Sequence, residues 1–458
     1  MNCHALTTAS AVAQRSKLIK EIGLPEQAIL ERLYRYTGRG ELAGVSDTLR
    51  GEVNYGYDAE GRLLKHYEAR QGNSSIHFIY DAADNLAAKD DLPLTDNRLH
   101  HWQNLFMQYD AWGNLTRRRS GLHEQHYMYD AENRLLTARG TGPQGRFEAH
   151  YRYDALGRRT HKTVITSHGT SETRFLWQGY RLLQEQHDVG RCSTYIYDPD
   201  ETWSPLARID HLQDDTTGKI YWFSTDLNGA PLEVTDAQGS IRWSGRYGCF
   251  GEVRHQTDGF TRVAASTAIR HQPLRYAGQY ADFETGLHYN LLRYYDPQTG
   301  RFIVQDPIGL NGGWNLYQYA PNPLGWIDPL GLTGKPLNSP MLDKWIEKGG
   351  TVWQEIDSQT WVYKDGMDNI VRYPGGYPDF KPYEIQSVDV PDLKGNHRLG
   401  PSGDFGKANA LAPDGPANLA DNTWHHHENG VTMQEVPKEI HSNFTHRGGV
   451  SKIKRTCP

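Results

Sequence analysis

The chain has 458 residues, with 49 Lys and Arg against 55 Asp and Glu and a formal net charge of −6 at pH 7. This length predicts more than one domain, and the charge gives no whole-chain argument for a nucleic-acid or membrane partner. The combination of 46 Gly, 27 Tyr and 12 Trp favours many short strands joined by turns over long helices.

The N-terminal region holds a helix-like segment, LIKEIGLPEQAILERLYRYT, at residues 18–37. No apolar run there marks a Sec signal peptide or a transmembrane helix. The four cysteines are far apart and lack CxxC spacing, which fits synthesis in a reducing cytoplasm better than a disulfide framework. We expect residues 1–50 to be a partly helical segment of unknown role, and any export to bypass the Sec route.

Tyr-Asp pairs recur through residues 50–200 at intervals of 20 to 44 residues, and several continue as YDAEGRLL, YDAWGNLT, YDAENRLL or YDALGRRT. Each unit predicts a strand, a tight turn whose Asp bonds the following backbone, and a second strand. Repeats of this length indicate stacked units that share one aromatic core. The six pairs are Tyr57-Asp58, Tyr80-Asp81, Tyr109-Asp110, Tyr129-Asp130, Tyr153-Asp154 and Tyr197-Asp198.

A different motif occurs twice near residue 320. Asp306-Pro-Ile-Gly-Leu returns 22 residues later as Asp328-Pro-Leu-Gly-Leu. Two carboxyl groups brought together can share one proton, so that one acts as a base toward water and the other as an acid toward a leaving amide. The alternative is that each Asp-Pro pair only begins a turn.

The repeats resemble the YD repeats of the RHS family, and residues 275–332 (RYAGQYADFETGLHYN to WIDPLGL) resemble its RHS-associated core. The resemblance implies a mainly β fold, with a YD-repeat β-shell over residues 51–270 closed by the core over residues 271–332. In this family the shell holds a variable C-terminal toxin and releases it through an internal aspartyl protease. By this resemblance Asp306 and Asp328 form the catalytic dyad, Arg293 supports them, and cleavage follows Leu332.

Beyond Leu332 the Tyr-Asp rhythm stops, and residues 333–458 are expected to form a separate domain. Ser339–Gly349 predicts a short helix with a Ser cap and a terminal Gly. Thr351–Tyr363 is strand-like, and residues 374–418 are rich in Pro and Gly and predict loops.

The most concentrated chemistry lies at residues 423–449, where five histidines occur between positions 425 and 446. Imidazole is a frequent metal ligand and a frequent general base near neutral pH. Asn429-Gly430 predicts a type I′ hairpin between Thr423–Glu428 and Val431–Val436. Pro437 then predicts the start of a helix that Gly448-Gly449 ends.

This ββα order resembles the HNH/endonuclease VII superfamily, in the branch with a Trp-His-His motif, here Trp424-His425-His426. The resemblance implies a small α+β, ββα-metal nuclease domain over residues 333–458. His425, His441 and His446 would hold a divalent metal ion, and His426 would be the general base. Three imidazoles and an open position suit Zn²⁺, while Mg²⁺, Mn²⁺ and Ni²⁺ stay open.

Two geometric points bear on these roles. An ideal strand sends His425 and His426 to opposite faces, so a shared site requires a strand start or a bulge there. His441 and His446 lie about 140° apart on an ideal helix, so His446 joins the site only if the helix ends near Thr445.

Other residues of this region carry weaker signals. His427 is expected at the surface or behind the ligands, and Asn443 either orients the base or faces solvent. The basic cluster of Lys452, Lys454 and Arg455 either follows phosphates or belongs to a frayed tail.

Together the resemblances imply an RHS-type antibacterial effector toxin that cleaves itself after Leu332 and releases a metal-dependent DNA endonuclease. They imply a DNA substrate, a cognate immunity protein and the spike components of a type VI secretion system as partners, and action of the toxin domain in the target-cell cytoplasm. Only about 50 residues precede the first Tyr-Asp pair, so we expect a shortened copy or delivery through another chain. Two alternatives stay open: an adhesive or carbohydrate-binding cell-surface protein with a structural metal site, and an RNase toxin.

Overall fold

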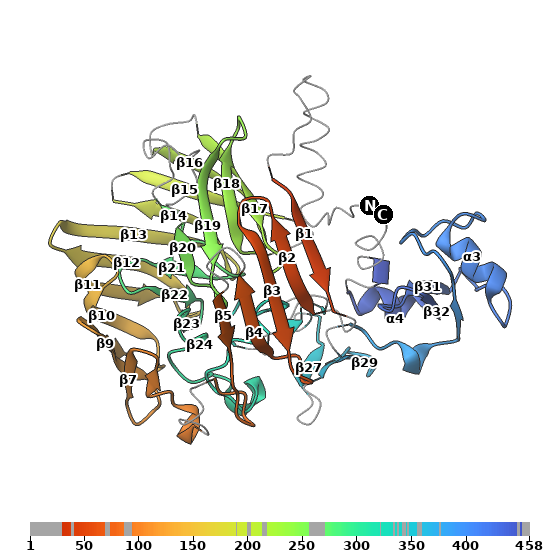
Figure 1. The fold of residues 1–458 in the computed structure, drawn as a ribbon, viewed down its shortest axis with the longest axis horizontal. Coiled ribbons are helices and arrows are strands. Elements are labelled where there is room, and N and C mark those ends of the chain that lie inside the picture. Colours follow the sequence, from red (N-terminus) through yellow and green to blue (C-terminus); the bar gives the residue numbers. More distant parts are fainter. Residues whose placement is uncertain are drawn as a thin grey trace. The chain divides into compact units, whose positions relative to one another are not determined.

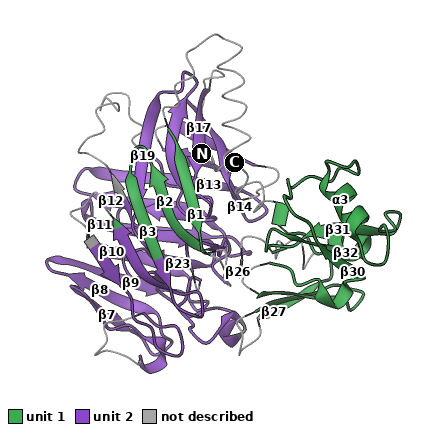
Figure 2. Ribbon diagram, turned by 45° about the vertical axis from the view of Figure 1, so that its right-hand side comes forward, with its two compact units in different colours: residues 1–55, 68–74, 335–458 green, residues 56–67, 75–334 purple. Residues whose placement is uncertain are grey.

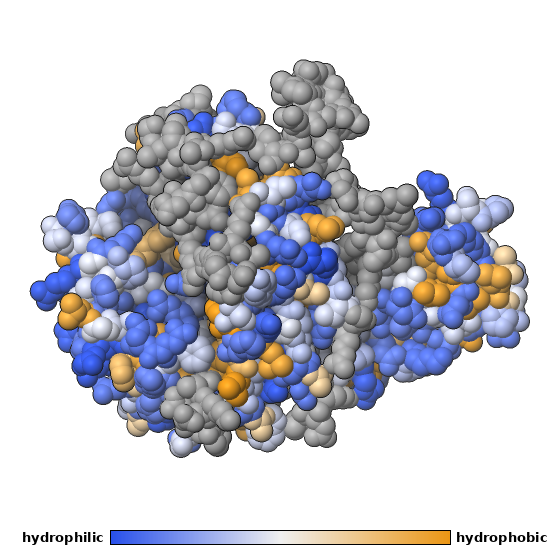
Figure 3. Space-filling model, viewed as in Figure 1, coloured by the Kyte–Doolittle hydropathy of each residue, from blue (hydrophilic) through white to orange (hydrophobic). Residues whose placement is uncertain are grey.

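The computed structural model describes residues 30–37, 41–68, 74–86, 94–188, 190–198, 203–212, 218–255, 271–320, 322–332, 335–336, 339–340, 345, 348–354, 360–374, 377–446 and 449–450. They are mainly strands, which confirms the predicted fold class. The chain divides into unit 1 (residues 1–55, 68–74 and 335–458) and unit 2 (residues 56–67 and 75–334) (Figure 2). In the face drawn in Figure 3, the described surface is mostly hydrophilic, with apolar side chains in small groups.

Unit 2 contains a long sheet in which each strand pairs with the next one in the chain, and we call this sheet the wall (Figure 1). Its described pairs are antiparallel, as expected for strands joined by short turns. The wall consists of β6 (His101–Trp102), β7 (Leu105–Tyr109), β8 (Leu115–Ser120), β9 (His123–Tyr129), β10 (Leu135–Gly142), β11 (Gly145–Tyr153), β12 (Arg159–Thr166), β13 (Gly169–Gln178), β14 (Arg181–His187), β15 (Arg191–Tyr197), β16 (Pro205–Leu212), β17 (Lys219–Thr225), β18 (Pro231–Asp236), β19 (Ile241–Tyr247) and β20 (Val253–His255).

The Tyr-Asp pairs make the predicted turns and also link successive repeats. Oδ1 of Asp130 accepts the backbone N–H groups of Glu132 and Arg134, each at 2.9 Å. The Tyr129 hydroxyl donates to the backbone carbonyl of Leu115, six residues after the previous repeat's tyrosine, at 2.7 Å. The strand–turn–strand prediction is therefore confirmed for the first five pairs, while the turn after Tyr197-Asp198 lies outside the described residues. From Tyr80 onward, the tyrosine hydroxyl donates to a backbone carbonyl of an earlier strand or turn. The same Asp geometry recurs at Asp58, Asp81, Asp110 and Asp154.

One face of the wall packs on residues 271–332, which we call the core segment. Along β11, Phe147, Ala149 and Tyr151 are buried in alternation with exposed neighbours. They share one hydrophobic cluster with Leu287 and Tyr289 of the core segment. The core segment contains β21 (Tyr280–Asp282), β22 (Leu287–Asn290), β23 (Arg293–Asp296) and β24 (Arg301–Phe302), which form one sheet, followed by the 3-10 helix η3 (Gly309–Gly312) and by β25 (Trp326–Ile327).

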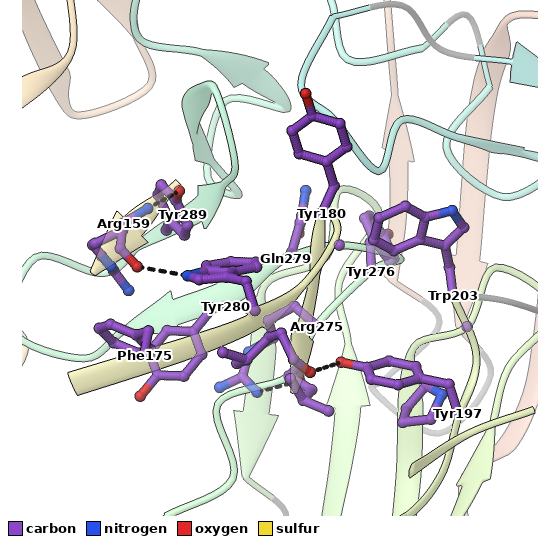
Figure 4. A pocket seen from close by; sticks show the side chains of 16 residues that line it. Arg159, Phe175, Tyr180, Tyr197, Trp203, Arg275, Tyr276, Gln279, Tyr280 and Tyr289 are labelled. Atoms are coloured by element: carbon purple, nitrogen blue, oxygen red, sulfur yellow. Dashed lines mark hydrogen bonds between the residues drawn. The ribbon is translucent and has the colours of Figure 1, made fainter. Parts of the chain in front are cut away.

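Buried charges also join the wall to the core segment. Arg159 and Lys162 of β12 lie 2.6 and 2.9 Å from the carboxylate of Asp282, and Lys162 lies 3.3 Å from Glu284. Arg159 also stacks over Tyr289, with the guanidinium 4.3 Å from the ring centroid. Figure 4 shows Arg159 and Tyr289 among the side chains that line an aromatic pocket. Breaking such a pair from one side leaves an uncompensated buried charge, so this cluster fixes where the core segment meets the wall.

Unit 1 contains three small sheets. β1 (Arg32–Tyr36), β2 (Leu42–Asp47) and β3 (Gly51–Tyr57) pair in succession, and β27 (Thr351–Gln354), β28 (Trp361–Lys364) and β29 (Ile370–Tyr373) do the same. In the third sheet β32 (Thr432–Pro437) lies between β30 (Gln386–Asp389) and β31 (Asn422–His426). The remaining elements of the chain are β4 (Leu63–Glu68), β5 (Ser74–His77), β26 (Lys335–Pro336), the helices α3 (Asp404–Leu411) and α4 (Lys438–Asn443), and the 3-10 helices η2 (Thr95–Asn97) and η5 (Lys381–Tyr383).

Several local predictions need correction. The helix predicted over residues 18–37 is wrong at its C-terminal end, because Arg32–Tyr36 is a strand that pairs with β2. Residues 18–29 of that segment lie outside the described part of the chain. The strand-like stretch Thr351–Tyr363 holds the two strands β27 and β28, and the loop-rich stretch 374–418 also contains β30 and α3. Most of the predicted helix Ser339–Gly349 lies outside the described residues.

The predicted hairpin of the histidine segment is confirmed, but its turn type is wrong. His426 pairs with Met433, and the backbone N–H of His427 donates to Thr432, so a four-residue connection replaces the expected two-residue one. A type I′ turn needs positive φ at both central residues, whereas Gly430 has φ +77° and Asn429 is not among the residues with positive φ. Oδ1 of Asn429 instead accepts the N–H groups of Val431 and Thr432.

Candidate functional site

Three imidazoles from the histidine segment converge on one point of unit 1. Nδ1 of His425, on β31, lies 3.3 Å from Nε2 of His441, on α4, and 3.2 Å from Nε2 of His446. The α4 helix ends at Asn443, so the chain turns before His446, as the 140° argument requires. The helix therefore ends earlier than the predicted Gly448-Gly449 stop, and Gly448 lies outside the described residues.

The surroundings of this cluster suit a metal ion. The Phe380 ring packs against all three imidazoles, with centroids 4.9 to 5.7 Å away. Burial and the neighbouring imidazoles lower the pKa of His425 far below its usual value and that of His441 to about 3, and burial lowers the pKa of His446. The imidazoles are therefore neutral, as ligation requires. A tetrahedral zinc ion spaces its ligand atoms about 3.3 Å apart, which matches the two separations.

His426 lies on the other face of the same strand, and β31 needs no bulge to place it there. The register with β32 is regular from Asn422 to His426, so alternation sends His425 toward α4 and His426 toward α3. Nε2 of His426 lies 3.0 Å from Oδ2 of Asp404, which is fully buried. A carboxylate only accepts hydrogen bonds, so Nε2 is the protonated nitrogen and Nδ1 carries the lone pair.

Asp404 itself is rigidly held, and the sequence analysis missed it. Although burial raises the pKa of its carboxyl, hydrogen bonds from the Lys394 and Asn396 backbone and from His426 outweigh that effect and lower the pKa overall. Trp424, two residues before His426 and on the same face, donates from Nε1 to Asn409 of α3 at 2.7 Å. The outer residues of the Trp-His-His motif therefore contact α3, while the middle residue belongs to the three-imidazole cluster.

The remaining residues that the sequence suggested make contacts outside the three-imidazole cluster. The side chain of His427 contacts Glu428 and the N–H of Asn429, outside the cluster. Asn443 is expected either to orient the base His426 or to face solvent. Its Nδ2 instead donates to Oδ2 of Asp365 at 2.8 Å. The exposed His397 lies beside His426, with ring centroids 5.6 Å apart, and no sequence pattern had singled it out. Lys452, Lys454 and Arg455 lie outside the described residues.

A second constellation lies in unit 2, where the duplicated Asp-Pro motifs meet. Nη2 of Arg293 lies 3.0 Å from Oδ2 of Asp306 and 3.5 Å from Oδ2 of Asp328. The same nitrogen donates to the carbonyl oxygen of Leu332 at 3.0 Å, and the Leu332 N–H donates to Oδ1 of Asp328 at 3.0 Å. The structure therefore brings together all three residues that the sequence assigned to self-cleavage, with the Leu332 backbone between them.

The electrostatics of this second site favour a shared proton. Burial raises the pKa of Asp328 to about 6 and also raises that of Asp306, while the Arg293 cation opposes both shifts. Burial in turn lowers the pKa of Arg293. The backbone is close-packed here, since a Cβ on Gly312 would overlap Oδ2 of Asp306 and lie 3.2 Å from the Leu332 carbonyl. Thr333, the residue after the expected cut, lies outside the described residues.

A wall of Tyr-Asp hairpins around a core segment, with a histidine-bearing ββα unit on the same chain, defines a β-shell protein that carries a nuclease-type module. Residues 45–323 match the family model of the teneurin YD-shell, and the chain belongs to this family. Residues 416–456 match a family described as a nuclease of the HNH/ENDO VII superfamily with conserved WHH, which agrees with the resemblance found from Trp424-His425-His426.

Similar proteins include toxins from several bacteria. The chain is 44% identical over 329 residues to double-stranded DNA deaminase toxin A of Burkholderia cenocepacia, covering 67% of this chain and 22% of that protein. It is 32% identical over 384 residues to toxin protein Tse5 of Pseudomonas aeruginosa (70% and 28% covered) and 30% identical over 323 residues to probable deoxyribonuclease RhsA of Dickeya dadantii (67% and 21% covered). The chain thus spans 21–28% of the length of these relatives. Within the described residues, no helix is long and apolar enough to cross a membrane.

Proposed function

We propose that the chain is a YD-shell toxin whose C-terminal region is a metal-dependent DNA endonuclease, freed by self-cleavage after Leu332. The observation that carries the nuclease proposal is the convergence of His425, His441 and His446, with His426 held by a buried carboxylate on the adjacent strand face. An adhesive protein has no need of a second, oriented histidine beside a three-imidazole site.

In the proposed nuclease reaction, His426 removes a proton from water through Nδ1 while Asp404 holds Nε2. This arrangement keeps the base in one tautomer and stabilises the imidazolium that forms. A divalent ion on the three imidazoles would supply stabilisation of charge on the scissile phosphate and on the departing 3′ oxygen. The donor set of three imidazoles favours Zn²⁺ over Mg²⁺ or Mn²⁺, whose preferred ligands are oxygens.

In the proposed self-cleavage, water attacks the carbonyl carbon of Leu332. The ionised carboxyl of the Asp306–Asp328 pair accepts the proton of water, and the protonated one donates to the departing amide nitrogen. Arg293 donates to the Leu332 carbonyl oxygen and stabilises the charge that develops there. The peptide bond breaks, leaving a carboxyl on Leu332 and a free amine on Thr333.

A DNA substrate agrees with the family matched by residues 416–456 and with the printed name of the Dickeya relative. Because a nuclease endangers the cell that makes it, we also propose a cognate immunity protein that covers the cluster. Delivery by a secretion spike, without a Sec signal, and action in the target-cell cytoplasm complete this proposal.

The nuclease proposal can be tested on the full chain. Plasmid DNA and total RNA are each incubated with the wild type, with His426→Ala and with Asp404→Ala, before and after metal removal by a chelator. DNA should be cut by the wild type, cutting should stop with chelator and resume with added Zn²⁺, and both variants should be strongly impaired while metal content is retained. His427→Ala is the matched control, because it removes a neighbouring imidazole outside the site. Cutting of RNA alone would replace the DNA assignment, and undiminished cutting by His426→Ala would reject the site.

Self-cleavage has its own test. The purified chain should yield a C-terminal fragment that begins at Thr333, and Asp328→Asn should keep the chain intact. A fragment that begins elsewhere, or normal cleavage of the variant, would reject the aspartyl assignment.

A further inference from the structure

We propose that unit 2 holds a second metal site, unrelated to the nuclease, in which Glu185, His187 and His271 bind a divalent cation of the zinc class. Their ligand atoms all lie within 4.8 Å of one another. Glu185 and His187 are on wall strand β14, and His271 is the first described residue of the core segment. The ion would therefore fasten the core segment to the wall.

The three donors have the spacing of a ligand set. Oε2 of Glu185 lies 3.1 Å from Nε2 of His271 and 3.7 Å from Nε2 of His187. The two imidazole rings lie nearly perpendicular, at 89°, with centroids 5.1 Å apart. Ligand atoms around a tetrahedral zinc ion are about 3.3 Å apart. The Glu185–His271 separation is close to this value, and the other two lie within 4.8 Å, so binding requires the His187 side chain to move inward.

His187 supplies the most direct sign that something is bound. Its Nε2 is buried and has no hydrogen-bond partner among the described residues. Its Nδ1 lies 3.3 Å from the Thr173 hydroxyl, which fixes the ring with Nε2 directed at the cluster. A buried polar atom without a partner destabilises the fold, and a metal ion at this position would remove that destabilisation. A partner on the far nitrogen is also the usual support of a ligating histidine.

Glu185 is positioned in the same way. Its carboxylate is fully buried and accepts the Tyr195 hydroxyl on Oε1 at 2.8 Å and the Tyr280 hydroxyl on Oε2 at 2.6 Å. The Tyr280 ring also lines the aromatic pocket drawn in Figure 4. The nearby Arg208 cation forms its ion pair with Asp210, at 2.6 Å, and makes no ion pair with Glu185 among the described residues, although its charge still acts on that carboxylate. The proposed ligand set is therefore one carboxylate and two imidazoles.

The wall contains two built-in comparisons for this site. The same Glu-x-His spacing occurs at Glu124/His126 and Glu148/His150, where each imidazole meets the glutamate of its own strand at 2.9 and 3.0 Å. The side chains of both pairs are 33–51% exposed, and neither pair belongs to a described group of three possible ligands. An i, i+2 pair alone therefore gives a surface contact, and the difference at Glu185 is burial together with His271.

The test counts metal ions on the full chain in a His441→Ala background, which removes a ligand of the nuclease cluster. This chain is stripped of metal, reloaded with Zn²⁺, freed of excess ion and analysed by mass spectrometry for metal content. It should retain about one Zn²⁺, and adding His187→Gln or His271→Gln should each remove it. His150→Gln is the matched control and should leave it in place. Cobalt loading gives a second readout, because a tetrahedral nitrogen–oxygen site produces strong visible absorption that both Gln variants should lose.

The outcomes distinguish this site from the proposed nuclease. If the His441→Ala chain retains no metal, or if His187→Gln and His271→Gln both retain it, the second site is wrong whatever the nuclease does. If instead the wild type and the His441→Ala chain hold the same single ion and His187→Gln removes it, the shell site stands and the nuclease metal assignment fails. Circular dichroism of each variant checks that the shell is folded, and two independent variants guard against misfolding of one.

Discussion

Replacing Asp328 by Asn should stabilise unit 2 at pH 8 even though it abolishes the proposed self-cleavage. Burial raises the pKa of this carboxyl from its usual 3.8 to about 6. The folded state therefore binds the proton more tightly than the unfolded state by about two pKa units, which corresponds to about 3 kcal/mol. At pH 8 that amount is the cost of keeping Asp328 ionised, and a neutral amide avoids it.

The sign of the effect follows from linkage. The stability contributed by protonated Asp328 is present in full below pH 3.8 and is lost as the pH rises to about 6. The gain from Asp328→Asn should thus be absent near pH 3.5, grow through pH 4–6 and stay constant above. The amide oxygen can still accept the Leu332 N–H that now bonds Oδ1 of Asp328. In a unit of this size each kcal/mol shifts Tm by roughly 2–4 °C.

The measurement needs a chain that does not cut itself, so Asp306→Asn serves as the parent. Thermal melts of this parent and of the Asp306→Asn/Asp328→Asn double variant are compared from pH 4 to pH 8. Asp130→Asn in the same parent is a control of opposite sign, because hydrogen bonds from Arg134 and Glu132 overcome desolvation and lower the pKa of Asp130. That variant should lose stability at neutral pH. A double variant no more stable than its parent at pH 8 would refute the claim that ionisation of the buried Asp328 destabilises unit 2.

Three further outcomes are expected. Self-cleavage should slow as the pH rises above about 6, because the dyad needs one protonated carboxyl and Asp328 then loses its proton; a rate that rises steadily to pH 8 would contradict a dyad. His426→Ala should lower DNA cleavage by about 10²–10⁴-fold with metal content unchanged. His441→Ala should lose only the ion of the His425/His441/His446 cluster, as elemental analysis and nicking assays would show together. Gly312→Ala should block self-cleavage in a folded chain, because the added Cβ would overlap the carboxylate of Asp306. Gly325→Ala is the control, since its Cβ has ordinary space, and it should cleave normally on a denaturing gel.

The repeat region could be predicted from the sequence because its information is local. The Asp of each of the first five Tyr-Asp pairs accepts the backbone N–H groups two and four residues ahead, so the motif specifies its own turn. The pairing of Tyr109 with a carbonyl ten residues earlier shows that the link between hairpins is also short-range. Because each hairpin contacts the one before it in the chain, the strands of the wall lie in chain order.

Distant partners could not be predicted in this way. Asp404 lies 22 residues before His426 in a stretch that reads as loop, and no spacing rule connects a carboxylate there to a histidine on a later strand. Phe380, which packs on all three imidazoles, gives no more signal than any other aromatic residue. Arg32–Tyr36 has helix-compatible residues, yet pairing with β2 decides its conformation, as tertiary context often does for short segments.

The apparent conflict in the Trp-His-His motif disappears once both faces of β31 are considered. Adjacent residues on a strand point in opposite directions, so the proposed metal ligand His425 and the proposed base His426 contact different helices. Here α4 and the chain beyond it surround His425, while α3 holds His426 through Asp404. Trp424 repeats the direction of His426 and bonds Asn409 on the same helix. The two outer residues of the motif therefore contact α3 on one face of β31, and the middle residue points to His441 and His446 on the other face.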